Sequence, residues 1–211
     1  MTSYNKSDLI IEGPQKGKTF LFAHGAGAPM DSDWMNLLTE KLVSRKIRVV
    51  RFEFPYMNEV RNTGKKRPPN SAKVLKESWL EVIDLFKNVK DLYIGGKSMG
   101  GRMASLVADE TKAKGLILLG FPFHAPGKDV GDRITHLESM KLRTAIFQGD
   151  RDSMGNFEDV KGYKLSKKIK VTWLEDGDHS FKPRKKSGQT LEGHLENVAD
   201  GISSFVNLTR E

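Results

Sequence analysis

Cysteine is absent from the 211-residue chain, and apolar runs long enough to cross a membrane are absent as well. Without a thiol, the protein forms no disulfide, uses no cysteine nucleophile and binds no metal through cysteine. The apolar stretch at residues 115–120 is far shorter than the roughly 20 residues of a transmembrane helix. Residues 1–8 hold no apolar signal-peptide core, so we expect a cytoplasmic protein with no membrane partner.

Signatures of metal and nucleic-acid binding are also missing. The five histidines are scattered without ligand spacing, and no H-E-x-x-H motif occurs. The net charge of +8 is divided among short basic clusters at residues 65–67, 167–170 and 184–186, none of which forms a long arm. Short clusters of this kind are typical of solvated faces. We therefore expect no metal, no cofactor and no nucleic-acid partner.

The remaining composition, 37% hydrophobic and 29% charged, is that of an ordinary globular protein. No repeat or linker divides the chain, so we predict one domain over residues 1–211. Short apolar runs alternate with amphipathic stretches, and the predicted strands are residues 9–11, 19–23, 47–54, 91–95, 115–120, 143–149 and 170–174. This alternation predicts an α/β fold, with a mostly parallel, doubly wound sheet and helices on both faces.

One segment interrupts this alternation. From Tyr56 to Asn70 the chain is basic and is predicted to be irregular, and a long loop inside a compact domain is usually functional. Together with the loop from Phe121 to Asp132, it is expected to form the rim of a site. The basic residues expected to make this rim positive are Lys65, Lys66, Arg67 and Lys128. The sequence therefore favours anionic or polar substrates.

A glycine-flanked serine lies between a predicted strand and a helix of small residues. Residues 96–100 read G-K-S-M-G, which matches G-x-S-x-G, and residues 101–108 continue as the helix. The motif places Ser98 on a strained turn above the sheet edge, with the Met99 N–H pointing into the same space. A phosphate-binding P-loop is excluded because Asp91 occupies the position of its first glycine. The alternative is a plain glycine-rich turn with an incidental serine.

A second glycine-rich turn follows an earlier strand. Residues 24–29 read H-G-A-G-A-P, and they fail as a dinucleotide fingerprint because Met30 replaces the third glycine. Small residues in such a turn let a backbone N–H approach a substrate oxygen closely. We favour the Ala26 N–H for this role, with Gly25 and Gly27 as alternatives.

Two later strand ends carry the remaining groups of an acyl-transfer site. Asp150 and Asp152 follow the predicted strand at residues 143–149, and His179 follows the one at residues 170–174. Loops after parallel strands gather at one edge of a sheet. There, a histidine can take the proton of a serine hydroxyl, while a carboxylate orients the imidazole.

Several other polar residues compete for roles at this site. The competing histidines are His24, His124, His136 and His194. His24 belongs to a strand-end turn and His194 to a helix face, so both are expected to be structural. His124 lies in a loop near the site and is a candidate substrate contact. For Arg102 we expect a salt bridge rather than a contact with an acidic substrate group.

Taken together, these stretches resemble the α/β-hydrolase superfamily. The matching stretches are the G-x-S-x-G turn, the His24-Gly25 turn, residues 149–152 and residues 177–181. More narrowly, the chain is similar to small proteins of the dienelactone-hydrolase type with a minimal cap or none. It is most similar to a branch of bacterial proteins and the animal testis-expressed-30 and KANSL3-like domains, through residues 24–28, 66–69, 98–102 and 123–128. The resemblance covers nearly the whole chain.

The resemblance implies a role for each candidate residue. Ser98 would be the nucleophile, His179 the base and Asp152 the acid, because superfamily acids commonly follow the strand-end glycine at this spacing. Asp150 stays a rival for the acid. The candidates for oxyanion and substrate binding are Ala26, Met99, Gly25 and His124.

The predicted function is therefore that of a serine hydrolase of the carboxylesterase or thioesterase kind. It would cleave an ester, thioester or related acyl bond through an acyl-enzyme intermediate. The expected partners are a small-molecule acyl substrate and, at most, a second copy of the chain. The alternative is a hydrolase-fold binding or scaffold module with little or no catalysis. Acyl transfer to an acceptor other than water would use the same residues, and the acyl chain stays open.

Overall fold

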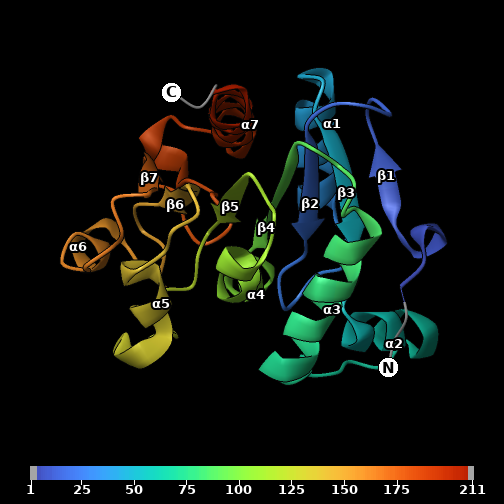
Figure 1. The fold of residues 1–211 in the computed structure, drawn as a ribbon. Coiled ribbons are helices and arrows are strands. Elements are labelled where there is room, and N and C mark those ends of the chain that lie inside the picture. The colour runs from blue at the N-terminus through green and yellow to red at the C-terminus, as the bar shows by residue number, and fades with distance from the viewer. Residues whose placement is uncertain (1–3, 209–211) are drawn as a thin grey trace.

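The computed structural model describes residues 4–208, which form a seven-stranded sheet with helices on both faces (Figure 1). The strands are β1 (Ile10–Glu12), β2 (Thr19–Ala23), β3 (Arg48–Phe52), β4 (Leu92–Lys97), β5 (Gly115–Leu119), β6 (Thr144–Gly149) and β7 (Ile169–Leu174). Their order is β1-β3-β2-β4-β5-β6-β7; β1 pairs with β3 in antiparallel fashion, and the other neighbours pair in parallel. The mostly parallel, doubly wound sheet is thus confirmed.

Helices cover the two faces of this sheet. They are α1 (Asp33–Ser44), α2 (Pro55–Thr63), α3 (Ala72–Leu85), α4 (Met99–Val107), α5 (Thr135–Glu138), α6 (Phe157–Val160) and α7 (Leu191–Asn207). Apolar residues of α1 and α7 form one buried cluster, whereas those of α3 and α4 form another on the opposite face (Figure 1). Strands β2, β4, β5 and β6 are buried along their whole length, as expected for continuous apolar runs between two helix layers.

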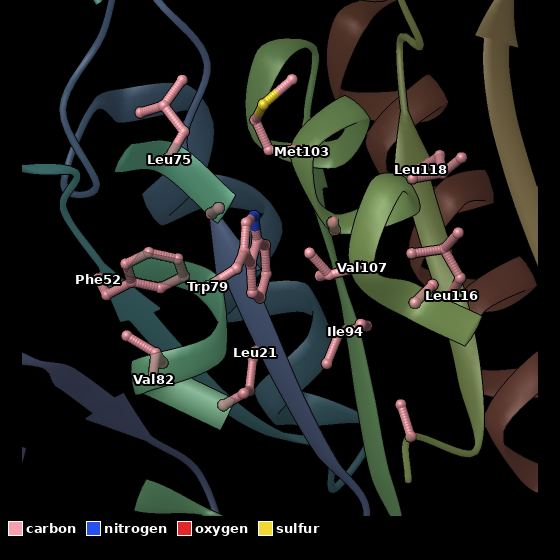
Figure 2. Packing of buried hydrophobic residues seen from close by; sticks show 14 of the residues in the cluster. Leu21, Phe52, Leu75, Trp79, Val82, Ile94, Met103, Val107, Leu116 and Leu118 are labelled. Atoms are coloured by element: carbon pink, nitrogen blue, oxygen red, sulfur yellow. The ribbon is translucent and has the colours of Figure 1, made fainter. Parts of the chain in front are cut away.

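The core on the α3 and α4 side is built around Trp79, the largest fully buried side chain. Its ring extends from α3 toward α4 (Figure 2) and packs edge-on against Phe52 with 4.9 Å between ring centroids. The indole N–H donates a hydrogen bond of 3.1 Å to the carbonyl of Gly100 in the first turn of α4. A core residue therefore fixes the start of the helix that follows Ser98.

The prediction of an irregular segment from Tyr56 to Asn70 is wrong for its first half. The helix α2 begins at Pro55, whose fixed φ suits the first position of a helix. It ends at Gly64 in the left-handed region, with φ of 67°. Tyr56 and Met57 are buried, and Val60, about one helical turn later, packs against the same cluster. Basic and polar residues around these positions obscure the helical spacing in the sequence. Residues 64–70 contain no helix or strand, as predicted.

The sheet topology brings separate segments to one edge. Strands β2, β4, β6 and β7 are parallel, so the turns that follow them lie at the same edge of the sheet. Within residues 4–208, no inserted cap covers this edge. The same part of the chain holds no helix with the length and apolar character needed to cross a bilayer.

Candidate active site

Ser98 lies at the junction of β4 and α4, in a backbone conformation that side chains rarely adopt. Its φ is 50° and its ψ is −117°, which makes it a non-glycine residue with positive φ. Its N–H donates to the Leu119 carbonyl at 2.9 Å, and its carbonyl accepts from the Arg102 N–H at 2.9 Å. The junction is therefore held from both the neighbouring strand and the following helix.

The glycines on either side of Ser98 are required by close backbone contacts. A Cβ atom at Gly96 would lie 2.5 Å from the Ala23 carbonyl oxygen, and one at Gly100 would lie 2.4 Å from that of His24. Both distances are far below van der Waals contact, and both contacts are to backbone atoms. The glycine spacing read in the sequence thus reflects the approach of β2 to the turn.

Ser98, His179 and Asp152 form a continuous chain of hydrogen bonds. The distance from Ser98 Oγ to His179 Nε2 is 2.8 Å, and the distance from His179 Nδ1 to Asp152 Oδ2 is also 2.8 Å. Because a carboxylate accepts hydrogen bonds, Nδ1 carries the ring proton and Nε2 accepts from the serine hydroxyl. The three residues come from the turns after β4, β6 and β7, as the sequence analysis expected.

Asp152 is fully buried, and each of its oxygens has an additional donor. Gln148 Nε2 donates to Oδ2 at 2.7 Å, and the Met154 N–H donates to Oδ1 at 2.8 Å. Gln148 also contacts the Phe121 backbone through both of its amide atoms. Sequence reasoning missed Gln148. The signal that could have identified it is a polar side chain near the end of a mostly apolar, fully buried strand.

Asp150 lies apart from His179 although it is only two positions from Asp152. It lines a different cavity together with Arg151, Asp176 and Arg184. Its Oδ1 atom is buried and has no hydrogen-bond partner among residues 4–208. The contact with His179 therefore belongs to Asp152.

Two residues that line a cavity with Ser98, Ala26 and Met99, have backbone N–H groups without an acceptor in the described chain. The N–H of Met99 is the first in α4, so the helix offers it no acceptor. Within the described chain, no atom accepts a hydrogen bond from the Ala26 N–H. A Cβ atom at Gly25 would lie 3.6 Å from Ser98 Cβ, which shows how closely this turn approaches the serine. Two unpaired donors beside a hydroxyl can stabilise negative charge on a reacting oxygen.

Two cavities flank Ser98 and share part of their walls. One, of about 480 Å³, is lined by the turn at residues 25–28 with Trp34, Lys97 and His179. The other, of about 310 Å³, is lined on its polar side by Asn70, Arg102 and Arg133. Ala26, Ser98 and Met154 line both cavities. A substrate held at Ser98 can thus extend in two directions.

Lys97 brings a buried positive charge to the first cavity. Its Nζ lies 5.8 Å from the ring centroid of Trp34 and 6.0 Å from that of Phe181. Burial lowers the pKa of Lys97 from 10.5 to about 8, and the charges of Asp152 and Asp178 oppose this shift. The ammonium group is therefore held on aromatic faces beside the triad.

The other candidate histidines are occupied by local contacts. His24 is fully buried; its Nε2 accepts from the Phe54 N–H at 3.1 Å, and burial lowers its pKa. His194 is also buried, with Nδ1 2.7 Å from the Phe181 carbonyl. His124 lies 3.2 Å from Asp159 and does not line either cavity at Ser98. A substrate contact for His124 stays a prediction.

The expected basic rim is divided in the structure. Lys66 and Arg67 line a cavity of about 520 Å³ that also includes Ala26, whereas Lys65 and Lys128 are exposed. The salt bridge expected for Arg102 is not formed with any residue in the described chain. In that same part of the chain, no cluster of three or more histidine or acidic residues could hold a metal ion.

Comparison with known proteins agrees with this architecture. Residues 16–207 match the family model of the alpha/beta hydrolase domain. No curated protein matches the sequence. Solved structures do match, among them an alpha-beta serine hydrolase homologue from Coxiella burnetii. It is 20% identical with a TM-score of 0.71, over 93% of this chain and 90% of that chain.

Two further structural relatives carry functional names. A dienelactone hydrolase from Anabaena variabilis is 18% identical with a TM-score of 0.70, over 96% of this chain and 91% of its own. Est1E from Butyrivibrio proteoclasticus with bound ferulic acid is 18% identical with a TM-score of 0.67, over 93% and 92%. At such identities the likeness establishes the fold, and the narrower animal branch stays a prediction. By its family model and its architecture, the chain belongs to the alpha/beta hydrolase family.

Proposed function

We propose that this protein is a serine hydrolase that cleaves an ester, thioester or related acyl bond through an acyl-enzyme intermediate. The observation that carries the proposal is the unbroken chain of 2.8 Å contacts from Asp152 through His179 to Ser98. The names of two structural relatives, a serine hydrolase homologue and a dienelactone hydrolase, support the same reaction class. In this proposal Ser98 is the nucleophile, His179 the general base and Asp152 the acid.

The first half of the reaction acylates Ser98. His179 Nε2 takes the hydroxyl proton as Ser98 Oγ bonds to the carbonyl carbon of the substrate. The carbonyl oxygen becomes an oxyanion, which the N–H groups of Met99 and Ala26 stabilise. As the tetrahedral intermediate collapses, the bond to the leaving group breaks and His179 returns the proton to that group.

The second half releases the acyl group. A water molecule gives a proton to His179 Nε2 while its oxygen attacks the acyl carbon on Ser98. The second tetrahedral intermediate uses the same two N–H donors, and its collapse returns the proton to Ser98 Oγ. If an alcohol or amine attacked the acyl carbon in place of water, the same residues would catalyse acyl transfer.

Asp152 acts by holding the imidazole in one tautomer and orientation. Its carboxylate is fixed by Gln148 and by the Met154 N–H, so it does not rotate away from His179. When His179 takes the proton from Ser98, the buried carboxylate stabilises the imidazolium. Gln148 is thereby a positioning residue for the acid.

Covalent labelling of the serine by a neutral fluorophosphonate probe tests this proposal. We expect labelling of the wild-type protein, complete loss in Ser98→Ala, and a fall of at least about 10²-fold in rate in His179→Ala. Ser153→Ala is the matched control, because Ser153 is an exposed serine in the loop that holds Asp152 and should leave labelling unchanged. Labelling that persists in Ser98→Ala, or a folded wild-type protein that is not labelled, contradicts the proposal. The second result favours a binding module that keeps the fold.

A further inference from the structure

The smaller cavity beside Ser98 has a positive wall. Arg102 and Arg133 line it together with Ser98. The rest of the lining is largely apolar and includes Leu75, Met99, Met103 and Met154. A group bound at Ser98 that enters this cavity therefore has both apolar side chains and two guanidinium groups within reach.

Arg102 is the first of the two cations. It lies one helical turn after Ser98, since its N–H donates to the Ser98 carbonyl at 2.9 Å. The side chain is half-buried, and its Nε atom is buried with no hydrogen-bond partner in the described chain. No carboxylate within residues 4–208 forms an ion pair with it, so its charge is neutralised by no residue of the described fold.

Arg133 reaches the same cavity from a different segment. It belongs to the short 3₁₀ turn Gly131–Ile134, and its Nη1 donates a long hydrogen bond of 3.4 Å to the Pro122 carbonyl. The remaining donors of its guanidinium have no partner among residues 4–208. Burial lowers the pKa of Arg102, and the nearby positive charge of Arg133 lowers it further. Two like charges thus lie close together in this wall.

The residues behind Arg102 do not neutralise it. His136 Nε2 lies 2.8 Å from Ser105 Oγ, and burial followed by the charge of Arg102 lowers its pKa to about 4. His136 is therefore neutral at pH 7. Asp109 is engaged elsewhere, since its carboxylate accepts from the Lys141 N–H at 3.0 Å and the Leu142 N–H at 2.9 Å.

Such an arrangement is costly without a ligand. Arg102 is partly desolvated without a carboxylate partner, and it lies close enough to Arg133 for the two positive charges to repel each other. An anion placed between them would remove both penalties. The fork of an arginine matches the geometry of carboxylate and phosphate oxygens. Ser98 and Arg102 are one turn of α4 apart, a rise of about 5.4 Å along the helix axis.

We propose that Arg102 and Arg133 form an anion-binding subsite that holds a carboxylate of the substrate while its acyl carbon lies at Ser98. The substrate class is then a monoester or thioester in which a short apolar spacer separates the scissile bond from the carboxylate. This inference rests on the proposed function of Ser98. It differs from the expected basic rim of Lys65, Lys66, Arg67 and Lys128, because the charges that select the substrate line the cavity beside Ser98.

Matched ester pairs test the subsite. The first pair is mono-p-nitrophenyl glutarate against p-nitrophenyl pentanoate, with the carboxylate on the acyl side. The second pair is 4-carboxyphenyl acetate against 4-methoxycarbonylphenyl acetate, with the carboxylate on the leaving group. We expect the wild-type protein to prefer the charged member of one pair. In Arg102→Met and Arg133→Met, that ratio of kcat/KM should fall by about tenfold to a hundredfold, the size of a charge-assisted hydrogen-bond pair.

A control and a second readout separate this inference from the reaction itself. Lys112→Met removes one exposed positive charge before β5, at the opposite edge of the sheet, and should leave the ratio unchanged. In Ser98→Ala, calorimetry should detect glutarate binding that disappears when Arg102→Met is added. If the probe labels Ser98 but the kcat/KM ratio of neither ester pair depends on Arg102 or Arg133, the proposed subsite is wrong and the proposed hydrolase function is unaffected. If glutarate binds Ser98→Ala as proposed but Ser98 of the wild type is never labelled, the hydrolase is wrong.

Discussion

Basic side chains in two regions of this protein differ in what neutralises them. On the α1 and α7 side, Arg45 Nε donates to Asp200 at 2.8 Å, and the same guanidinium also contacts Glu196. After β7, Asp176 accepts from Arg184 Nε at 2.7 Å, and Arg151 lies 2.9 Å from the same carboxylate. Arg45, Arg151 and Arg184 therefore each have a carboxylate partner.

The cations around Ser98 are arranged differently. Within residues 4–208, Lys97, Arg102 and Arg133 form no ion pair. Lys97 rests on aromatic faces, and the two arginines share the wall of a cavity. The chain has 35 lysines and arginines against 27 acidic residues, so a surplus of cations exists. Arg45, Arg151 and Arg184 have carboxylate partners, whereas Lys97, Arg102 and Arg133 have none within residues 4–208.

The largest expected effect comes from removing the carboxylate of Asp152, which contacts His179 and whose charge also favours protonated Lys97. Asp152→Asn should lower the rate of fluorophosphonate labelling by about 10³–10⁴-fold, because an amide no longer holds His179 in the productive tautomer. The matched control is Asp150→Asn, which should label at nearly the wild-type rate. A larger loss in Asp150→Asn than in Asp152→Asn would reverse the assignment of the acid.

The variant Lys97→Met tests whether the buried charge of Lys97 lowers the free energy of unfolding. Its pKa falls from 10.5 to about 8 on folding, so below pH 8 the native state carries the full penalty of a buried charge. That shift corresponds to about 3 kcal/mol, of which the two ring faces offset about 1 kcal/mol. Lys97→Met should therefore raise the free energy of unfolding by about 2 kcal/mol at pH 7. Urea denaturation measures this difference.

The pH dependence gives the control for Lys97. Between pH 8 and 10.5 the unfolded chain binds the proton that the folded protein has lost, so wild-type stability rises with pH. The difference in free energy of unfolding between Lys97→Met and the wild type should accordingly vanish by about pH 10.5. The free energy of unfolding of Lys112→Met should match that of the wild type over the whole pH range. A loss of stability in Lys97→Met at pH 7 would show that the aromatic faces outweigh desolvation.

A smaller effect is expected from breaking a neutralised cluster. Asp176 has its pKa lowered from 3.8 to about 2, first by its hydrogen bond with Arg184, and it links the loops after β6 and β7. Its contribution to stability is present above pH 3.8 and is lost as pH falls through 2. Asp176→Asn should therefore lower the Tm at pH 6, and the difference from wild type should shrink toward pH 3. Equal differences at both values would contradict the pairing as its cause.

Much of this site could be predicted because its signals are local. The glycine spacing around Ser98 follows from backbone contacts with β2 that no Cβ atom tolerates. The meeting of the serine, acid and histidine follows from parallel strands whose carboxyl ends share one edge. The resemblance favoured Asp152, and its contact with His179 has the geometry that this role requires.

The rest depends on which distant segments meet. The partner of an arginine cannot be read from its neighbours in sequence, so a salt bridge for Arg102 was a reasonable expectation that the fold does not fulfil. Gln148 reaches the Phe121 backbone only when β6 lies beside β5. The α2 helix was missed because its apolar residues are few and polar residues dominate the segment around it.

The smallest expected effect comes from Arg67, a cation with a carboxylate partner that lines the cavity of about 520 Å³ together with Lys66. Arg67 lies 2.6 Å from Glu59, and their side chains are 46% and 49% exposed. Exposed pairs contribute little, so Arg67→Ala should lower the free energy of unfolding by about 0.5 kcal/mol or less. At 1 M salt, where the screening length is about 3 Å, this difference in free energy of unfolding should disappear.

The ester pairs apply to Arg67→Ala as well. A tenfold fall in its ratio of kcat/KM for the charged ester to that for the neutral ester would assign substrate selection to the rim and not to Arg102 and Arg133.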